Sequence, residues 1–220
     1  MFDYEKETLE AYKNDLRAKE YKDYHTQRLS WGRLATWREQ QILERELFRY
    51  KWSAEDKLLD IPCGTGVLGK LLHKFPFKIV GSDISKEMIE LAKAEYPANR
   101  LEGCIVADIT NTGFPKESFS CTIVLGFFHR VPLEIKSTAI KEISSLSTKL
   151  VILSCSVDSA FTRFKHKLMA VLNSSLKPAP CPTNVKYIVA ECEKNNLRLV
   201  RKRSIMPIIS AHTLFVFEKV

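Results

Sequence analysis

The segment KLLDIPCGTGVLGKLL, residues 57–72, constrains the fold more than any other part of the chain. A short apolar run ends at Asp60, a turn with Gly64 and Gly66 follows, and a helical pattern begins directly after it. Glycines have no Cβ atom, so the backbone of this turn can approach a ligand closely at the N-terminus of the following helix. With Gly69 the spacing is G-x-G-x-x-G, which several classes of nucleotide-binding protein share. The segment therefore predicts a strand–turn–helix unit of a nucleotide-binding sheet.

From residue 57 onward, short apolar runs alternate with helical stretches, which is typical of a parallel sheet with crossover helices. The expected strands are Lys57–Ile61, Lys78–Ser82, Leu101–Ala107, Phe119–Leu125, Lys149–Cys155, Leu197–Ile205 and His212–Glu218. The expected helices lie at about 66–74, 86–95, 133–147, 158–174 and 183–195. The last two strands are too close in sequence for a crossover, so they should form an antiparallel hairpin. The predicted fold class is α/β: a Rossmann-like, doubly wound seven-stranded sheet, mostly parallel, with helices on both faces.

A chain of 220 residues of this type fits one domain, which we expect to span residues 1–220. Within it, residues 1–56 should form an N-terminal helical cap, 57–155 the cofactor-binding core, and 156–220 the acceptor-side helices and terminal hairpin. The apolar spacing from Leu34 to Trp52 predicts an amphipathic helix packed on the main body. Residues 3–24 favour an exposed or lid-like helix.

Composition excludes several classes of protein. With 45% hydrophobic and 10% aromatic residues the chain is not disordered, and its apolar runs are far shorter than the ~20 residues that span a bilayer. The N-terminus is charged from its third residue, unlike a signal peptide. The six cysteines form no C-x-x-C pair, so we expect reduced thiols, no metal site and a cytoplasmic location.

The formal charge of +8 lies entirely within residues 131–220. Arg163, Lys165 and Lys167 fall on one predicted helix, where they could attract an acidic acceptor or an anionic membrane surface. The basic run at residues 198–203 has a simpler interpretation, because Lys and Arg commonly protect an edge strand from intermolecular pairing.

Two carboxylates indicate the ligand of the glycine turn. Asp83 follows the second strand, 17 residues after Gly66, where an acid can accept hydrogen bonds from a ribose diol. Asp60 would repel a pyrophosphate, but it would attract the sulfonium and ammonium of S-adenosylmethionine. This difference favours the methyl donor over a nicotinamide dinucleotide. After the third strand, Asp108 could accept a hydrogen bond from an adenine amino group, with Ile84 and Ile109 as apolar contacts.

The residues DIPCGTG, GSDIS, VADIT and CTIVLGFFHRVP resemble, in order and spacing, the nucleotide-site motifs of class I S-adenosylmethionine-dependent methyltransferases. The similarity covers about residues 57–155 and is closest to the small-molecule branch with the ubiquinone and menaquinone biosynthesis enzymes. Two positions depart from the family pattern: Pro62 and Cys63 replace a commoner Gly-x pair, and SSLSTK replaces Pro-Gly-Gly before the fifth strand.

Carried over by position, the resemblance implies that Gly64 and Gly66 approach the methionine part of the cofactor, while Asp60 orients its amino end. Leu125 would offer a backbone carbonyl to the ammonium, and Asp83 would bind the ribose. The implied cofactor-binding set is Asp60, Pro62, Cys63, Gly64, Thr65, Gly66, Asp83, Ile84, Met88, Asp108, Ile109, Leu125 and, as a partner for the methionine carboxylate, Arg33.

Methyl transfer needs mainly alignment, because the sulfonium already activates the carbon. If the acceptor is a hydroxyl or a carbon acid, His129 could serve as a base at the mouth of the site. An equally weighted interpretation makes it a histidine at a helix start, packed against Val131 and Pro132. Of the adjacent Phe127 and Phe128, we expect one in the core and one in an acceptor pocket.

The sequence thus predicts an S-adenosylmethionine-dependent methyltransferase that acts on a small acceptor, acidic or lipid-like, and releases S-adenosylhomocysteine. One alternative is an RNA or protein methyltransferase that uses the basic C-terminal face, although nucleic acid is the less favoured acceptor. The other is a non-catalytic, cofactor-binding accessory subunit. Neither the acceptor nor the oligomeric state follows from these residues.

Overall fold

The structure is a computed structural model, and it describes residues 31–158, 163, 181–206 and 211–220. The predicted helix at 3–24 and nearly all of the one at 158–174 lie outside these residues, as do Lys165 and Lys167.

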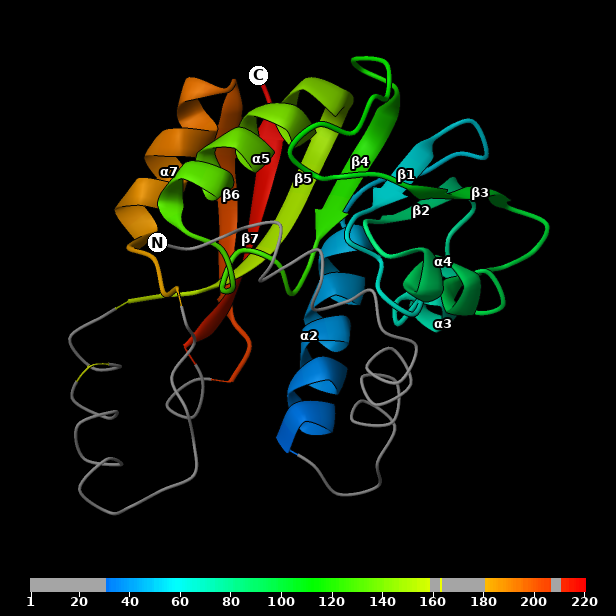
Figure 1. The fold of residues 1–220 in the computed structure, drawn as a ribbon, viewed down its shortest axis with the longest axis horizontal. Helices are drawn as coiled ribbons and strands as arrows, with labels where there is room; N and C mark the ends of the chain where they lie inside the picture. The colour runs from blue at the N-terminus through cyan, green and yellow to red at the C-terminus, as the bar shows by residue number, and fades with distance from the viewer. Residues whose placement is uncertain (1–30, 159–162, 164–180, 207–210) are drawn as a thin grey trace.

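One seven-stranded sheet forms the centre of the molecule, in the order β3-β2-β1-β4-β5-β7-β6 (Figure 1). The strands are β1 (Lys57–Asp60), β2 (Lys78–Asp83), β3 (Leu101–Val106), β4 (Phe119–Val124), β5 (Ser147–Ser156), β6 (Leu197–Ser204) and β7 (His212–Lys219). The first five strands pair in parallel, whereas β7 inserts antiparallel between β5 and β6. The predicted α/β fold with its antiparallel C-terminal hairpin is confirmed, and the expected strand bounds agree to within two residues.

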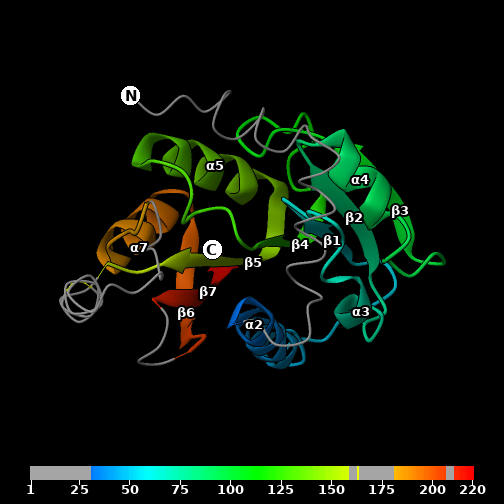
Figure 2. The ribbon, with the colours of Figure 1, turned by 60° about the horizontal axis from the view of Figure 1, so that its bottom comes forward.

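Helices cover both faces of the sheet. They are α2 (Trp31–Leu47), α3 (Gly69–Leu72), α4 (Lys86–Ala92), α5 (Leu133–Leu146) and α7 (Val185–Lys194). Figure 2 shows α5 and α7 on one side of the sheet and α2 and α3 on the other. Residues of α2, α3 and α4 share one hydrophobic core with one face of the strands, and residues of α5 and α7 share a second core with the other face.

Two helices are shorter than the sequence pattern indicated. The expected helix at 66–74 is only the four-residue α3, because Gly64 and Gly66 adopt positive φ angles of 53° and 77° and the chain turns through this region. The expected helix at 86–95 ends at Ala92, and the segment after it packs against the glycine turn.

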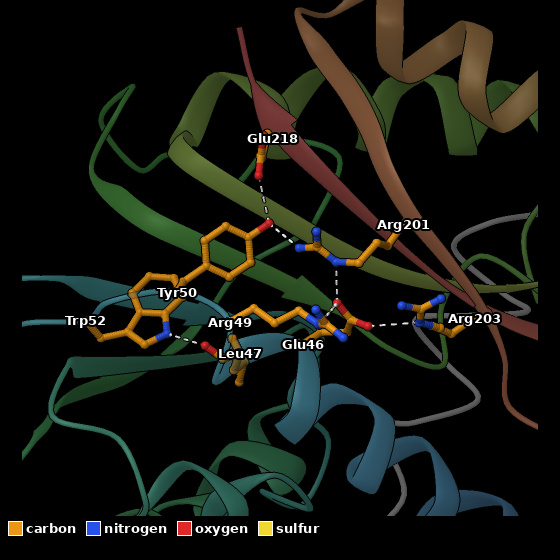
Figure 3. A network of polar contacts seen from close by, with 8 residues as sticks. All are labelled: Glu46, Leu47, Arg49, Tyr50, Trp52, Arg201, Arg203 and Glu218. Atoms are coloured by element: carbon orange, nitrogen blue, oxygen red, sulfur yellow. Dashed lines mark hydrogen bonds and ion pairs between the residues drawn. The ribbon is translucent and has the colours of Figure 1, made fainter.

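A buried carboxylate joins α2 to the far edge of the sheet (Figure 3). Glu46 on α2 is 2% exposed, and it pairs with Arg201 and with Arg203, whose Nε lies 3.0 Å from Oε1. Arg49 lies 3.3 Å from the same carboxylate. Nearby, the Tyr50 hydroxyl donates to Glu218 at 2.9 Å and accepts from Arg201.

These contacts extend the interpretation of residues 198–203. Strand β6 does lie at the sheet edge, as expected. Two of its arginines, however, pair with Glu46 across to α2, and Arg198 pairs with Glu218 at 3.1 Å. Much of this basic run is therefore neutralised within the molecule, and its ion pairs with Glu46 hold α2 against the β6–β7 hairpin.

Candidate methyl-donor and acceptor site

The turn after β1 is held in place by its own backbone. The Cys63 N–H donates to the Ser82 carbonyl of β2 at 2.8 Å, and the Gly66 N–H donates to the Cys63 carbonyl at 3.0 Å. A Cβ at Gly66 would lie 2.9 Å from the Glu95 Cβ, and one at Gly69 would lie 2.1 Å from the Glu95 carbonyl oxygen. Gly66 and Gly69 are thus required by packing against the chain after α4, a reason that the motif spacing did not reveal.

Asp83, the last residue of β2, ties this turn to α4. Its Oδ2 accepts from the Gly64 N–H at 2.8 Å and its Oδ1 from the Ser85 N–H at 3.0 Å. Burial raises the pKa of the carboxyl, and hydrogen bonds from the backbone of Ser85, Gly64 and Ile84 oppose the rise. A carboxylate offers about four lone-pair sites, so a ribose hydroxyl can still bind. Asp83 therefore shapes the turn and keeps acceptor capacity for the ribose.

Asp60 is almost fully buried at the end of β1. The Tyr96 hydroxyl donates to its Oδ2 at 2.6 Å. Burial raises the pKa of Asp60 to about 7; the Tyr96 hydrogen bond lowers it and the charge of Asp83 raises it. Neighbouring positive charge would favour the ionised form. No sequence signal pointed to Tyr96, which lies 36 residues further along the chain.

The residues expected at the adenine lie mostly in packed surroundings. Ser85 caps α4, accepting from the Met88 N–H at 3.1 Å, and Met88 is buried. Asp108 is partly buried and its Oδ1 accepts from both the N–H and the hydroxyl of Thr110, each at 2.8 Å. Ile109 is buried in the core on the α5 side.

The other predicted cofactor-binding residues lie around the turn or on α2. Pro62 and Ile84 are partly buried, as is Leu125, which packs against the core on the α2 side. Cys63 and Thr65 are buried, and burial raises the pKa of the Cys63 thiol well above its ordinary value. Arg33 is exposed.

His129 lies in the loop between β4 and α5, beyond the carboxyl end of β4. Burial lowers the pKa of its imidazole to about 3, and the charges of His212, Arg130 and Lys136 lower it further, so the ring is neutral near pH 7. Nε2 accepts from the Arg130 Nε at 3.2 Å, which places the ring proton on Nδ1. Nδ1 is buried and has no partner among the described residues.

Phe127 and Phe128 do not divide between core and pocket as expected. Both are buried in the core on the α5 side, with ring centroids 5.4 Å apart. They pack there because Gly126, with φ 73°, turns the chain away from β4 just before them.

The site also includes residues of α2 that the sequence did not single out. The Gln40 amide donates to the Val67 carbonyl, just after the glycine turn, at 2.9 Å. Its neighbour Glu39 makes a hydrogen bond with Ser154 near the end of β5. Within the described part of the chain, no group of three or more His, Cys, Asp or Glu side chains could hold a metal ion. None of the described helices is long and apolar enough to cross a membrane.

Comparison with known proteins gives a family and a fold. Residues 58–149 match the family model described as a methyltransferase domain. A protein of Geobacillus sp. (strain WCH70) that carries a provisional methyltransferase name is 32% identical to this chain over 62 residues. That match includes 28% of this chain and spans about a quarter (25%) of the relative's length.

Solved structures share the whole fold at low identity. Magnesium protoporphyrin IX methyltransferase (ChlM) from Synechocystis PCC 6803 with bound S-adenosylhomocysteine superposes with a TM-score of 0.78 at 16% identity, covering 98% of this chain and 100% of that one. Geranyl diphosphate C-methyltransferase from Streptomyces coelicolor A3(2) gives 0.60 at 12% identity, covering 82% and 79%. A methyltransferase in complex with the Trm112 activator of Haloferax volcanii gives 0.65 at 15% identity, covering 97% and 98%.

The molecule thus has the Rossmann-like fold of methyltransferases. The domain match covers residues 58–149, the part of the chain whose motifs resemble those of class I S-adenosylmethionine-dependent methyltransferases. The finer resemblance to the quinone-biosynthesis branch is not confirmed, since the structures named here act on other molecules or have no stated acceptor.

The donor set at the edge of β1 and β2 fits S-adenosylmethionine. It offers two buried carboxylates, one with remaining acceptor capacity for a ribose hydroxyl and one suited to a cation, beside glycines at positive φ. The Ser82 hydroxyl at the same edge is buried without a partner among the described residues.

Proposed function

We propose that this protein transfers a methyl group from S-adenosylmethionine to a small-molecule acceptor. The observation that carries the proposal is the pair of buried carboxylates, Asp60 and Asp83, at the carboxyl ends of adjacent parallel strands around the glycine turn. Asp83 would bind the ribose hydroxyls and Asp60 the positively charged methionine end. Gly64 and Gly66 would let the backbone approach the methionine moiety. Bound there, the cofactor supplies an electrophilic methyl group on a sulfonium.

Several predicted contacts extend this site. We propose that the Leu125 carbonyl accepts from the cofactor ammonium, and that Arg33 pairs with the methionine carboxylate. Asp108 would accept from the adenine amino group. Pro62, Cys63, Thr65, Ile84, Met88 and Ile109 would shape the walls around these contacts.

His129 gains a more specific role than the general base first considered. Its lowered pKa makes it a weak base near pH 7, because base strength in catalysis follows pKa. Its Nδ1–H, which has no partner among the described residues, is instead a hydrogen-bond donor. We propose that it donates to an oxygen of the acceptor and orients it.

The pairing of four arginines favours a small acceptor over a macromolecule. Arg198, Arg201 and Arg203 pair with carboxylates of the same chain, and Arg163 pairs with Asp158 at 2.6 Å. The charges of these four arginines are therefore less available to phosphates. ChlM and the geranyl diphosphate enzyme are named for small molecules, which supports the same choice.

Calorimetry with S-adenosylhomocysteine tests the cofactor site. Asp83→Asn should weaken binding at least about tenfold, the equivalent of one lost hydrogen bond to a charged group. Glu55→Gln, a change at a carboxylate that is 89% exposed and precedes the N-terminal end of β1, should bind like the wild type. Absence of binding to the folded wild-type protein would refute the proposed function.

A further inference from the structure

Helix α2 joins the two halves of the candidate site through consecutive residues. Gln40 donates to the Val67 carbonyl beside the glycine turn, while Glu39 bonds Ser154 near the carboxyl end of β5. In Figures 1 and 2, α2 lies on the same side of the sheet as α3, between α3 and the part of the sheet that holds β7. Glu39 therefore lies between the expected position of the methyl donor and the end of the sheet expected to hold the acceptor.

The hydrogen bonds around Glu39 have a definite direction. The Gly126 N–H, one residue beyond Leu125, donates to the Ser154 Oγ at 3.3 Å. Ser154 is buried, and its hydroxyl proton is then free to point at the Glu39 carboxylate, whose pKa this bond lowers. Two hydrogen bonds thus connect the carboxylate to the loop after β4.

Glu39 is a partly buried carboxylate, and among the described residues no charged side chain contributes to the shift of its pKa. Burial raises its pKa to about 7, and the Ser154 hydroxyl opposes the rise. On the same face of the sheet, His212 of β7 and His129 of the adjoining loop are neutral near pH 7, because burial lowers both pKa values. Arg38 is the cation next to Glu39 in sequence, and Arg130 lies on the same loop as His129. Neither contributes to the shift of the Glu39 pKa.

We propose that Glu39 is the general base of methyl transfer and that the acceptor presents a phenol or enol hydroxyl to it. This inference rests on the proposed function. As the acceptor oxygen bonds to the methyl carbon, its O–H bond breaks and the proton passes to the Glu39 carboxylate. The carbon–sulfur bond breaks with its electron pair on sulfur, which becomes a neutral thioether, so charge and atoms balance.

The hydroxyl class follows from the strength of this base. A phenol loses its proton at a pKa of about 10, close enough to that of Glu39 for assistance in the transition state. A carboxylic acid is already ionised at neutral pH and needs no base. The neutral His129 Nδ1–H would complement Glu39 by donating to a second oxygen of the same acceptor.

Glu39→Gln tests the inference, because the amide keeps the shape and still accepts from Ser154. Glu44→Gln, on the same helix but paired with Lys74 at 2.8 Å, is the matched control. The assays are calorimetry with S-adenosylhomocysteine and transfer of labelled methyl from S-adenosylmethionine to a panel of phenols and to a low-molecular-weight cell extract. We expect Glu39→Gln to bind the product like the wild type but to transfer methyl at least about 100-fold more slowly.

The pH profile and infrared difference spectra separate a base from a structural role. The wild-type rate should rise with pH through about 7, Glu39→Gln should lose this limb, and Ser154→Ala should move it to higher pH because a bond that lowers the pKa is gone. The protonated carboxyl absorption present at pH 6 and absent at pH 9 should be weaker in Glu39→Gln by the Glu39 component, leaving the component from Asp60, whose pKa is also raised to about 7.

The outcomes distinguish the inference from the function on which it rests. Wild-type activity in Glu39→Gln, or a Glu39 carboxyl fully ionised at pH 6, would overturn the base and leave the methyltransferase intact. Wild-type protein that binds no S-adenosylhomocysteine, or that labels no compound in panel or extract, would overturn both.

Discussion

Replacing Glu46 with Gln should destabilise the protein by about 2 kcal/mol, although this residue lies outside the candidate site. The carboxylate is 2% exposed and faces three guanidinium groups, those of Arg49, Arg201 and Arg203. Removing its charge leaves those cations without their shared anion. The Arg201 guanidinium would keep only the Tyr50 hydroxyl and the Tyr50 ring, whose centroid lies 5.4 Å away.

The magnitude follows from the exposure of the three partners. Loss of one member of a fully buried ion pair costs about 3–5 kcal/mol. Arg49 and Arg203 are 54% and 45% exposed, so water can replace much of what they lose, whereas Arg201 is only 23% exposed. The cost therefore falls mainly on one cation, giving about 2 kcal/mol. For a chain of this size that corresponds to a decrease in Tm of about 4–8 °C.

Urea unfolding and calorimetric melting of Glu46→Gln would measure this effect. The matched control is Glu55→Gln, whose carboxylate is 89% exposed and lies 3.6 Å from Lys78; it should change stability by less than about 0.5 kcal/mol. The loss in Glu46→Gln should persist in 0.5 M salt, since buried pairs are weakly screened. If the two variants were equally stable, the assignment of this contact as the fastening of α2 would be refuted.

Three further predictions concern the glycine turn and two buried acids. Gly69→Ala should cost about 2 kcal/mol or more in urea unfolding, since its Cβ would lie 2.1 Å from the Glu95 carbonyl, whereas Gly103→Ala, with no contact under 3.8 Å, should be nearly neutral. Asp60 has a pKa raised to about 7, so the wild type loses stability as pH rises from about 4 to 7; Asp60→Asn should remove this dependence, gaining up to about 3 kcal/mol relative to wild type between pH 5 and 8, and equal pH slopes would contradict it. For Asp56, burial raises the pKa, but hydrogen bonds from neighbouring Lys and Ser side chains outweigh it and the net pKa is lowered. Its stabilisation is therefore present above about pH 4 and lost as pH falls through the lower folded value, so Asp56→Asn should be destabilised at pH 7 and approach the wild type below pH 3.

The strand ends of the cofactor site could be predicted from sequence because local signals mark them. At Asp60 and Asp83 an apolar run stops at a carboxylate, and in a parallel sheet such ends meet at one edge. The Ser85 cap was also predictable, since a helix cap depends on the residues immediately after it. These features use contacts between near neighbours or between strands whose order the pattern implies.

The partners of those carboxylates could not be predicted in the same way. Tyr96 reaches Asp60 from 36 residues away, and Glu39 reaches Ser154 from an element outside every motif. The extent of the helix after the glycine turn was also overestimated, because the packing of Glu95 against Gly66 and Gly69 favours a turn where local propensity favours a helix.

The sequence by itself determined where the strands lie along the chain, the resemblance to methyltransferases and the position of the glycine turn, because each depends on local hydrophobic periodicity and on residues close together in the chain. The tertiary structure alone decided the ionisation of the site and the use of the basic residues. Burial raises the pKa values of Asp60 and Glu39 and lowers that of His129, and the approach of α2 to β6 pairs Arg201 and Arg203 with Glu46. Burial and charge pairing depend on contacts between distant segments, and those contacts exist only once the chain has folded.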